Sequence, residues 1–444
     1  MGKRSILKIL GIISIVLYLF APSFFSMEYV ACCFVIFIAS SFIMLSSNCK
    51  YTLLKFELFF LLSFLFTNYV YPIVFYPINP YFSLFRIPFN ENYIVKGTAL
   101  ATLAATWFCV GIYEKKTIKI HFKETFDIKK KLKIPRITTI LLFLLFIPSL
   151  YTIYRSGVYS TEFESSYVNV ILKYVILYVI FAFTYNNRTL KFGQFSRLAL
   201  SSIVIQFTFL YVILFLLIGS RTIPLNIVLF SILLINILIY RISKKQITIL
   251  IIGGALLLTA VGLARGGSGI EGGAITSIWD IGTDLTINNR SLYVLIEEVD
   301  NHGVTYGATF LMNILSAVPF AQYLFLDISG LPLSTISSAN LVTDLHFDSV
   351  QNEERFGLGT NLVGDVYLAF GLVGVIFLFW LFGYVLRRLY FNIGRGKTIS
   401  LLIYALFFMS TIYYTRSGYL TPVRDIVWVL GVFWISNLRQ FSHE

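Results

Sequence analysis

Arginine is the residue type in this sequence best suited to hold an anionic group. Its guanidinium presents a rigid fork of N–H donors that matches phosphate and carboxylate oxygens in pairs, whereas lysine offers a point charge. The basic residues predicted to face outward are mostly arginine: Arg86, Arg155, Arg221, Arg265, Arg290, Arg355, Arg416 and Arg424, with only Lys96 and Lys173. The bias favours recognition of an anion, although a single arginine at the end of a span can instead reach lipid headgroups.

Three of these arginines have positions that restrict what they can contact. Arg221 lies in the tight turn Gly219-Ser220-Arg221 between two apolar runs, so it has little freedom to leave the membrane surface. It is predicted to contact the phosphates of a lipid-linked molecule, with headgroup anchoring as the alternative. Arg265 follows an apolar run and Arg290 opens an amphipathic segment; both are candidate binding residues, but a solvated charge at a helix end explains either almost as well.

Polar side chains also gather where a later apolar run begins. Asn361 and Asp365 are four residues apart, which places them on one face of a helix, and Tyr367 follows two residues later. A carboxylate near the membrane boundary is a functional candidate, and Asp365 could accept a proton from a sugar hydroxyl. The alternative is a polar cap at the interface. Gly371 and Gly374 are expected to permit close helix packing.

The sequence gives little support for metal, cofactor or nucleophile chemistry. The four histidines, His121, His302, His346 and His443, are scattered, and no histidine or carboxylate pair has a recognised ligand spacing. There is no Gly-x-Ser-x-Gly element for a serine nucleophile. We therefore expect no metal and no cofactor.

Composition identifies the elements that must position these residues. The chain has 444 residues, 57% hydrophobic and only 13% charged, and long apolar runs recur throughout. This pattern excludes a soluble domain and predicts an all-α polytopic membrane protein. The net charge of +13 comes from short connectors between the runs, so it indicates membrane topology rather than a nucleic acid partner.

Hydropathy predicts about 12 transmembrane helices, whose apolar runs have some 14 to 25 residues each. The runs are Ile6 to Phe25, Met27 to Leu45, Phe56 to Tyr71, Ile94 to Tyr113, Ile137 to Tyr154, Tyr167 to Phe183, Leu198 to Ile218, Leu225 to Tyr240, Ile247 to Ala264, Leu362 to Leu386, Ile399 to Tyr414 and Val423 to Ser436. Most lysines and arginines fall in alternate connectors, which places both termini in the cytoplasm.

The predicted division is nine helices in 1–264, one large external loop in 265–361 and three helices in 362–444. Within the loop, Leu292, Leu295, Ile296 and Val299 recur at helical spacing, so an amphipathic helix is expected before Gly303. The uncharged segment Thr305 to Leu326 is expected to be re-entrant or interfacial, because a crossing there would move the basic residues after it to the outside.

Several short motifs in this order resemble a known family. They are Ser220-Arg221 after a mid-chain span, Arg290 early in a loop helix, Gly303 with Gly307, and then Asn361, Tyr367, Gly371 and Gly374. With the loop length, they resemble the bacterial O-antigen and capsule repeat-unit polymerases of the Wzy type, within the larger polymerase and ligase superfamily. Related ligases place a histidine just before the asparagine, where this chain has Thr360. The departure leaves the identity of the proton acceptor open, with Asp365 as the candidate.

The resemblance implies polymerisation of undecaprenyl-diphosphate-linked oligosaccharides at the outer face of the bacterial inner membrane. Arg221, Arg290 and Arg265 would bind diphosphate, Asn361 and Tyr367 the acceptor, and Asp365, Arg221 and Arg290 would be catalytic without a metal. Donor and acceptor glycolipids, membrane lipids and a chain-length regulator protein are the implied partners. Two alternatives remain open at this level: a flippase or transporter for the same lipid-linked repeats, and an O-antigen-type ligase.

Overall fold

The computed structural model describes residues 2–48, 54–79, 89–113, 126, 131–134, 140, 142, 144–148, 151, 167–217, 220–250, 252–254, 286–349 and 357–441. Over these residues the chain forms helices and no strand. Four helices are long and apolar enough to cross a membrane, Met27–Ser46, Tyr93–Tyr113, Val168–Asn186 and Leu362–Ile393, and two bent helix pairs raise that number to six. The helical membrane class is confirmed, while the full set of twelve spans stays a prediction.

Contacts divide the chain into two compact units, each assembled from distant parts of the sequence. The first contains residues 1–118, 282–391 and 411–424, and the second contains residues 119–281, 392–410 and 425–444. The predicted spans Ile137 to Tyr154 and Ile247 to Ala264 lie largely outside the described residues.

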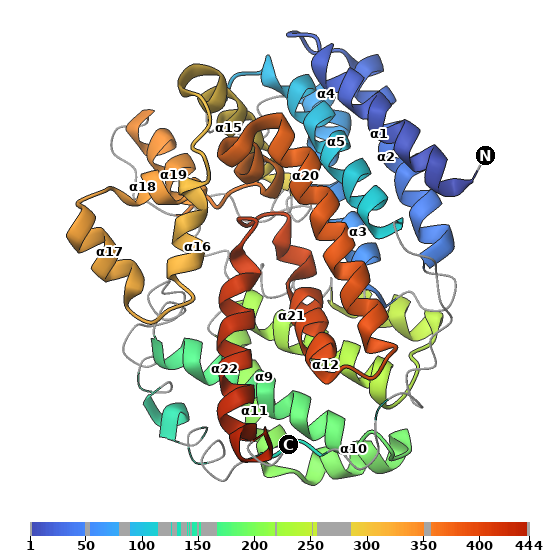
Figure 1. The fold of residues 1–444 in the computed structure, drawn as a ribbon, viewed down its shortest axis with the longest axis vertical. Coiled ribbons are helices and arrows are strands. Elements are labelled where there is room, and N and C mark those ends of the chain that lie inside the picture. Colours follow the sequence, from blue (N-terminus) through green and yellow to red (C-terminus); the bar gives the residue numbers. More distant parts are fainter. Residues whose placement is uncertain are drawn as a thin grey trace. The chain divides into compact units, whose positions relative to one another are not determined.

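The first unit carries most of the helices relevant to the site (Figure 1). In chain order they are α1 (Lys3–Leu19), α2 (Met27–Asn48), α3 (Phe56–Asn68), a π-helix (Tyr71–Phe75), α4 (Tyr76–Ile78), α5 (Tyr93–Tyr113), α15 (Asn289–His302), a 3-10 helix (Ala308–Phe310), α16 (Leu311–Leu315), α17 (Ala321–Ser329), α18 (Leu333–Ile336), α19 (Ser338–Ser349) and nearly all of α20 (Leu362–Ile393). Figure 1 shows α1, α2 and α5 side by side, in agreement with their many mutual contacts.

Small residues allow α5 and α20 to approach closely. A Cβ atom added to Gly111 would lie 2.1 Å from the carbonyl oxygen of Trp380, and one added to Gly383 would lie 2.3 Å from that of Phe108. Glycine is therefore required at both positions for the two backbones to touch, as is common between helices in membranes. This contact fixes α20 against the helix that also supports α15.

The second unit contains α9 (Tyr167–Asn186), α10 (Phe192–Ser201), α11 (Ile203–Leu217), α12 (Thr222–Leu238) and most of α21 (Thr398–Tyr414) and α22 (Thr421–Phe441). Lys173, the charge nearest the middle of a predicted span, is paired there with Asp425 at 3.1 Å. The Tyr174 hydroxyl donates to the same carboxylate at 2.7 Å. The charge is thus neutralised within this unit, as a buried ion in an apolar environment requires.

One predicted span differs from the structure. Hydropathy predicts a single helix from Leu198 to Ile218, but α10 and α11 are bent by 77° at Ser202, whose backbone is extended. The side chain of Gln206 donates to the carbonyl of Leu200 at 2.8 Å and so satisfies a backbone group that the break exposes. Hydropathy cannot detect such a break, because the residues on both sides are apolar.

Candidate functional site

The predicted amphipathic loop helix is confirmed as α15, with Gly303 directly after it. Its apolar positions Leu292, Leu295 and Ile296 are fully buried. Two glycines let the helix dock: a Cβ at Gly97 of α5 would lie 2.7 Å from the Tyr293 ring, and one at Gly364 of α20 would lie 2.8 Å from Leu295. Residues in the first turn of α15 are therefore held between two helices long enough to span the membrane.

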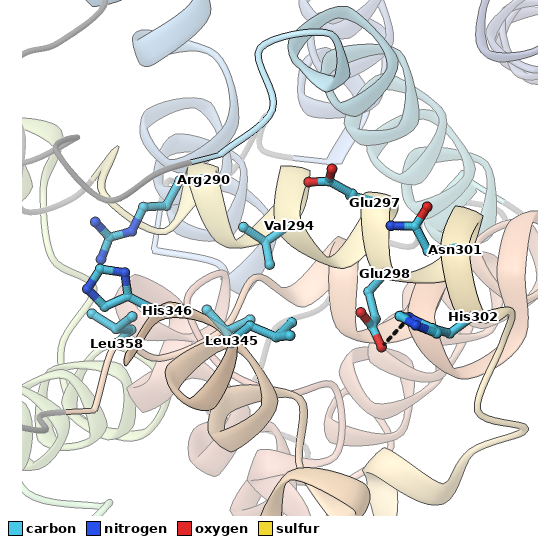
Figure 2. A pocket seen from close by; sticks show the side chains of 10 residues that line it. Arg290, Val294, Glu297, Glu298, Asn301, His302, Leu345, His346 and Leu358 are labelled. Carbon is cyan, nitrogen blue, oxygen red and sulfur yellow. Dashed lines mark ion pairs between the residues drawn. The ribbon is translucent and has the colours of Figure 1, made fainter. Parts of the chain in front are cut away.

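Arg290 lies in that first turn and is only 2% exposed. Burial lowers the pKa of its guanidinium to about 9, which still leaves the group cationic at neutral pH. Figure 2 shows the guanidinium beside the imidazole of His346, which comes from α19. A cation held in this way, with one side on a groove, is suited to bind an anionic ligand.

The groove beside Arg290 has a volume of about 310 Å³ and lies between α15 and α19. Its lining residues are Arg290, Val294, Glu297, Glu298, Asn301, His302, Val342, Leu345, His346 and Leu358. Arg290 makes one end of the groove basic, whereas Glu297 and Glu298 make the other end acidic (Figure 2). The charge of the groove lining therefore changes from basic to acidic along its length.

Asn361 caps the start of α20. Its side-chain oxygen accepts hydrogen bonds from the backbone amides of Val363 at 2.9 Å and Gly364 at 3.4 Å. Its amide nitrogen donates to the side-chain oxygen of Asn68 at 3.0 Å and to the carbonyl of Asn288 at 3.3 Å. Because Asn361 is fully buried, these bonds give it a structural role, and its predicted contact to an acceptor stays a prediction.

Sequence analysis did not single out Asn288, which links the Arg290 turn to two other segments. Its side chain donates to the carbonyls of Leu358 at 3.0 Å and Thr360 at 3.2 Å, and it accepts from Arg416 Nε at 2.6 Å. The pair Asn288-Asn289 directly before Arg290 is the signal that could have identified it. One of the predicted outward-facing arginines, Arg416, is thereby tied to the backbone that positions Arg290.

Asp365 is fully buried and hydrogen-bonded through both carboxylate oxygens. One oxygen accepts from Ser338 Oγ at 2.6 Å, and the other accepts from the backbone amide of Tyr419 at 2.7 Å. The amide of Asp365 donates to the carbonyl of Asn361, which confirms that the two residues are one helical turn apart. Asp365 does not belong to the groove lining, so its role as proton acceptor remains a prediction.

The other predicted residues lie away from the groove or outside the described residues. The Tyr367 hydroxyl accepts from Tyr18 Oη of α1 at 2.7 Å. Ser220 and Arg221 directly precede α12 in the second unit, and Arg221 is half-buried there. Arg265 and Gly219 lie outside the described residues.

The glycines after α15 serve backbone conformation more than packing. Gly303, Gly307 and Gly371 all have positive φ, and Gly371, with φ 64° and ψ −155°, interrupts α20. Loop amides donate hydrogen bonds to the carbonyl groups just before the break. The amide of Thr305 donates to the carbonyl of Leu368 at 2.8 Å, and the amide of Gly307 donates to the carbonyl of Ala369 at 3.2 Å. At Gly371 the structure therefore has a helix break instead of the predicted close helix packing, and the carbonyl groups before the break accept hydrogen bonds from the loop.

Metal chemistry finds no new support in the described part of the chain, where no group of three or more histidine, cysteine or acidic side chains is placed to hold an ion. The described histidines of the groove, His302 and His346, lie on different helices. His302 forms an ion pair with Glu298 at 3.0 Å if protonated. The expectation of a metal-free site remains a prediction.

These features define a helical membrane protein in which a buried arginine lines a groove of mixed charge. The model of the O-antigen polysaccharide polymerase Wzy family matches residues 5–443, so the chain belongs to this family. Membership makes it a polymerase that acts on lipid-linked sugars, as the resemblance of its motifs implied. Comparison with curated proteins and with solved structures found no match.

Proposed function

We propose that this polymerase joins undecaprenyl-diphosphate-linked repeat units at the outer face of the bacterial cytoplasmic membrane, with both of its termini inside. Family membership supports the reaction class, and the alternation of basic connectors supports the orientation. The observation that carries the choice of site is Arg290, a buried cation that lines the groove between α15 and α19. A diphosphate is the part of such a substrate that a fixed guanidinium recognises.

The reaction needs charge neutralisation and one proton transfer. A hydroxyl oxygen of the acceptor sugar attacks the anomeric carbon of the donor, and the bond from that carbon to the diphosphate oxygen breaks. The electron pair leaves with the lipid diphosphate, while the hydroxyl proton passes to a base. Arg290 would stabilise the charge that develops on the diphosphate, and such fixed donors are often the largest contribution to catalysis.

The remaining roles are proposed from the sequence. Arg221 and Arg265 would bind diphosphate, Asn361 and Tyr367 the acceptor, and Asp365 would accept the proton. The reaction would need no metal or cofactor, since diphosphate is already a good leaving group. Purified protein with lipid-linked repeats should then polymerise in excess chelator, and activity that returned only with a divalent ion would contradict this part.

A deletion strain tests the proposed reaction. Surface glycan from the strain should carry a single repeat unit per acceptor, and the long polymer should return when the wild-type chain is expressed. Complete loss of transferred glycan would instead indicate a ligase or a flippase. Expression of Arg290→Ala in the same strain connects the result to the site, because it should leave single repeats while the protein remains in the membrane.

A further inference from the structure

One face of α15 forms a continuous wall of the groove. Arg290, Val294, Glu297 and Asn301 follow one another at intervals of three or four residues, and Glu298 lies four residues after Val294, which puts all five in one stripe of the helix. At 1.5 Å of rise per residue, the stripe extends for roughly 16 Å. The wall is long enough for several parts of one extended ligand to be bound at once.

We propose that this groove binds the donor glycan with its diphosphate at Arg290 and its first sugars along α15 towards Glu297 and Glu298, and that these glutamates exclude sugars that carry carboxylates. The inference rests on the proposed function and adds a direction and a selectivity to it. The direction follows from the bond that breaks, since the anomeric carbon adjoins the diphosphate and must lie at the basic end. The donor sugars that follow the anomeric carbon then extend along α15 towards the acidic end of the groove.

The glutamates have the geometry and charge to read sugar hydroxyls. A carboxylate only accepts hydrogen bonds, and the hydroxyl and amino groups of neutral or amino sugars donate them. The Glu298 carboxylate is oriented by His302 at 3.0 Å, and that of Glu297 accepts from Asn90 Nδ2 at 3.3 Å. A uronic acid would bring a like charge to these carboxylates and would be repelled.

Apolar side chains in the middle of the groove suit the apolar faces of sugar rings. Val342 and Leu345 of α19, with Val294 of α15, provide hydrocarbon surface between the two charged ends. The nearby pair Lys96 and Asp300, 2.5 Å apart, neutralises itself and does not line the groove. The charge contrast along the groove therefore comes from Arg290 at one end and the two glutamates at the other.

Binding to full-length protein in lipid nanodiscs tests the proposal with three probes. The first probe is farnesyl diphosphate. The other two are farnesyl-diphosphate disaccharides, one with galactose and one with galacturonic acid as the second sugar, so these two differ only in the oxidation of C6. Wild-type protein should bind the galactose probe at least about tenfold more tightly than the galacturonic acid probe. The double variant Glu297→Gln, Glu298→Gln should lose this preference and keep its affinity for farnesyl diphosphate.

Asp327→Asn is the matched control, because Asp327 is an exposed acid on α17 outside the groove, and this variant should keep the preference. Equal affinity of wild-type protein for the two disaccharides would overturn the proposal without need of any variant, as would a preference that survives in the double variant. Failure of the proposed function would look different. In that case Arg290→Ala would bind farnesyl diphosphate as well as wild type does.

Discussion

At the scale of single residues, the structure separates side chains that can meet a substrate from those that hold the fold. Arg290 lines the groove, whereas Asp365 and Asn361 do not, and both are hydrogen-bonded to neighbouring protein groups. The sequence identified all three as candidate site residues, Arg290 in the external loop and the other two near the membrane boundary. It could not distinguish them, because a structural cap and a binding residue have the same side-chain chemistry.

Arg290→Lys tests whether the guanidinium fork matters. If Arg290 binds diphosphate through paired hydrogen bonds, lysine should fail nearly as badly as alanine, because it keeps the charge and loses the rigid fork of paired donors. A charge-assisted hydrogen bond contributes about 1.5 to 3 kcal/mol, so turnover should fall roughly ten- to a hundredfold if the contact acts in the transition state. The measurement is the rate of polymer formation from lipid-linked repeats with equal amounts of folded protein.

The same two substitutions, to lysine and to alanine, test Arg221, which is also predicted to bind diphosphate. Arg395→Lys, in a connector predicted to be cytoplasmic, is the control and should polymerise normally. Near-normal polymer from Arg290→Lys would mean that a point charge is sufficient there. Near-normal polymer from Arg221→Lys would instead favour headgroup anchoring, since lysine reaches headgroups as well as arginine does.

Asp365→Asn separates a structural carboxylate from a proton acceptor. The substitution keeps the shape but weakens acceptance of the hydrogen bonds from Ser338 and Tyr419, so we expect stability to fall by about 1 to 3 kcal/mol. Because a general base typically contributes about a hundredfold or more, activity per folded molecule should fall at least about a hundredfold if Asp365 accepts the proton as proposed. Thermal unfolding of the purified protein and the polymerisation rate are measured together. A loss of rate of less than about tenfold would leave Asp365 with a structural role only.

At the scale of elements, periodic patterns predicted α15 well but missed the breaks in other helices. The spacing of Leu292, Leu295 and Ile296 and the following Gly303 gave both the helix and its end. The bend at Ser202 and the interruption of α20 at Gly371 lie within apolar runs. Each break depends on partners for freed backbone groups, and such partners follow from tertiary contacts that no local pattern encodes.

Gly371→Ala tests the break in α20. With φ 64° and ψ −155°, Gly371 has a conformation that is nearly exclusive to glycine, so alanine should cost about 1 to 3 kcal/mol of stability. The loop segment that donates to Leu368 and Ala369 should loosen as well. Gly431→Ala in α22 is the control, because its Cβ would meet open space, and it should be neutral or slightly stabilising. Thermal unfolding in detergent and protease sensitivity near Thr305 are the two measurements.

At the scale of the whole molecule, the sequence predicted the class and could not predict the assembly. Composition predicted a helical membrane protein, and the order of weak motifs indicated the family that the match over residues 5–443 shows. The two compact units each combine three separate stretches of chain, so their cores consist of contacts between residues far apart in sequence. Hydropathy reports the environment of each segment but says nothing about which segments pack together.

Topology is the prediction on which the proposed site depends most. Reporter fusions at Asn301 and Asp348 should both read as external, and a fusion at Gly394 should read as cytoplasmic, because the basic residues around Gly394 are retained inside. The short helices α16 and α17 have five and nine residues, too few for either to span a bilayer alone, which favours Asn301 and Asp348 on one side. An external Asn301 with a cytoplasmic Asp348 would mean that the segment between them crosses the membrane. The groove between α15 and α19 could then no longer be an outer-face donor site, even though the protein would remain a polymerase of this family.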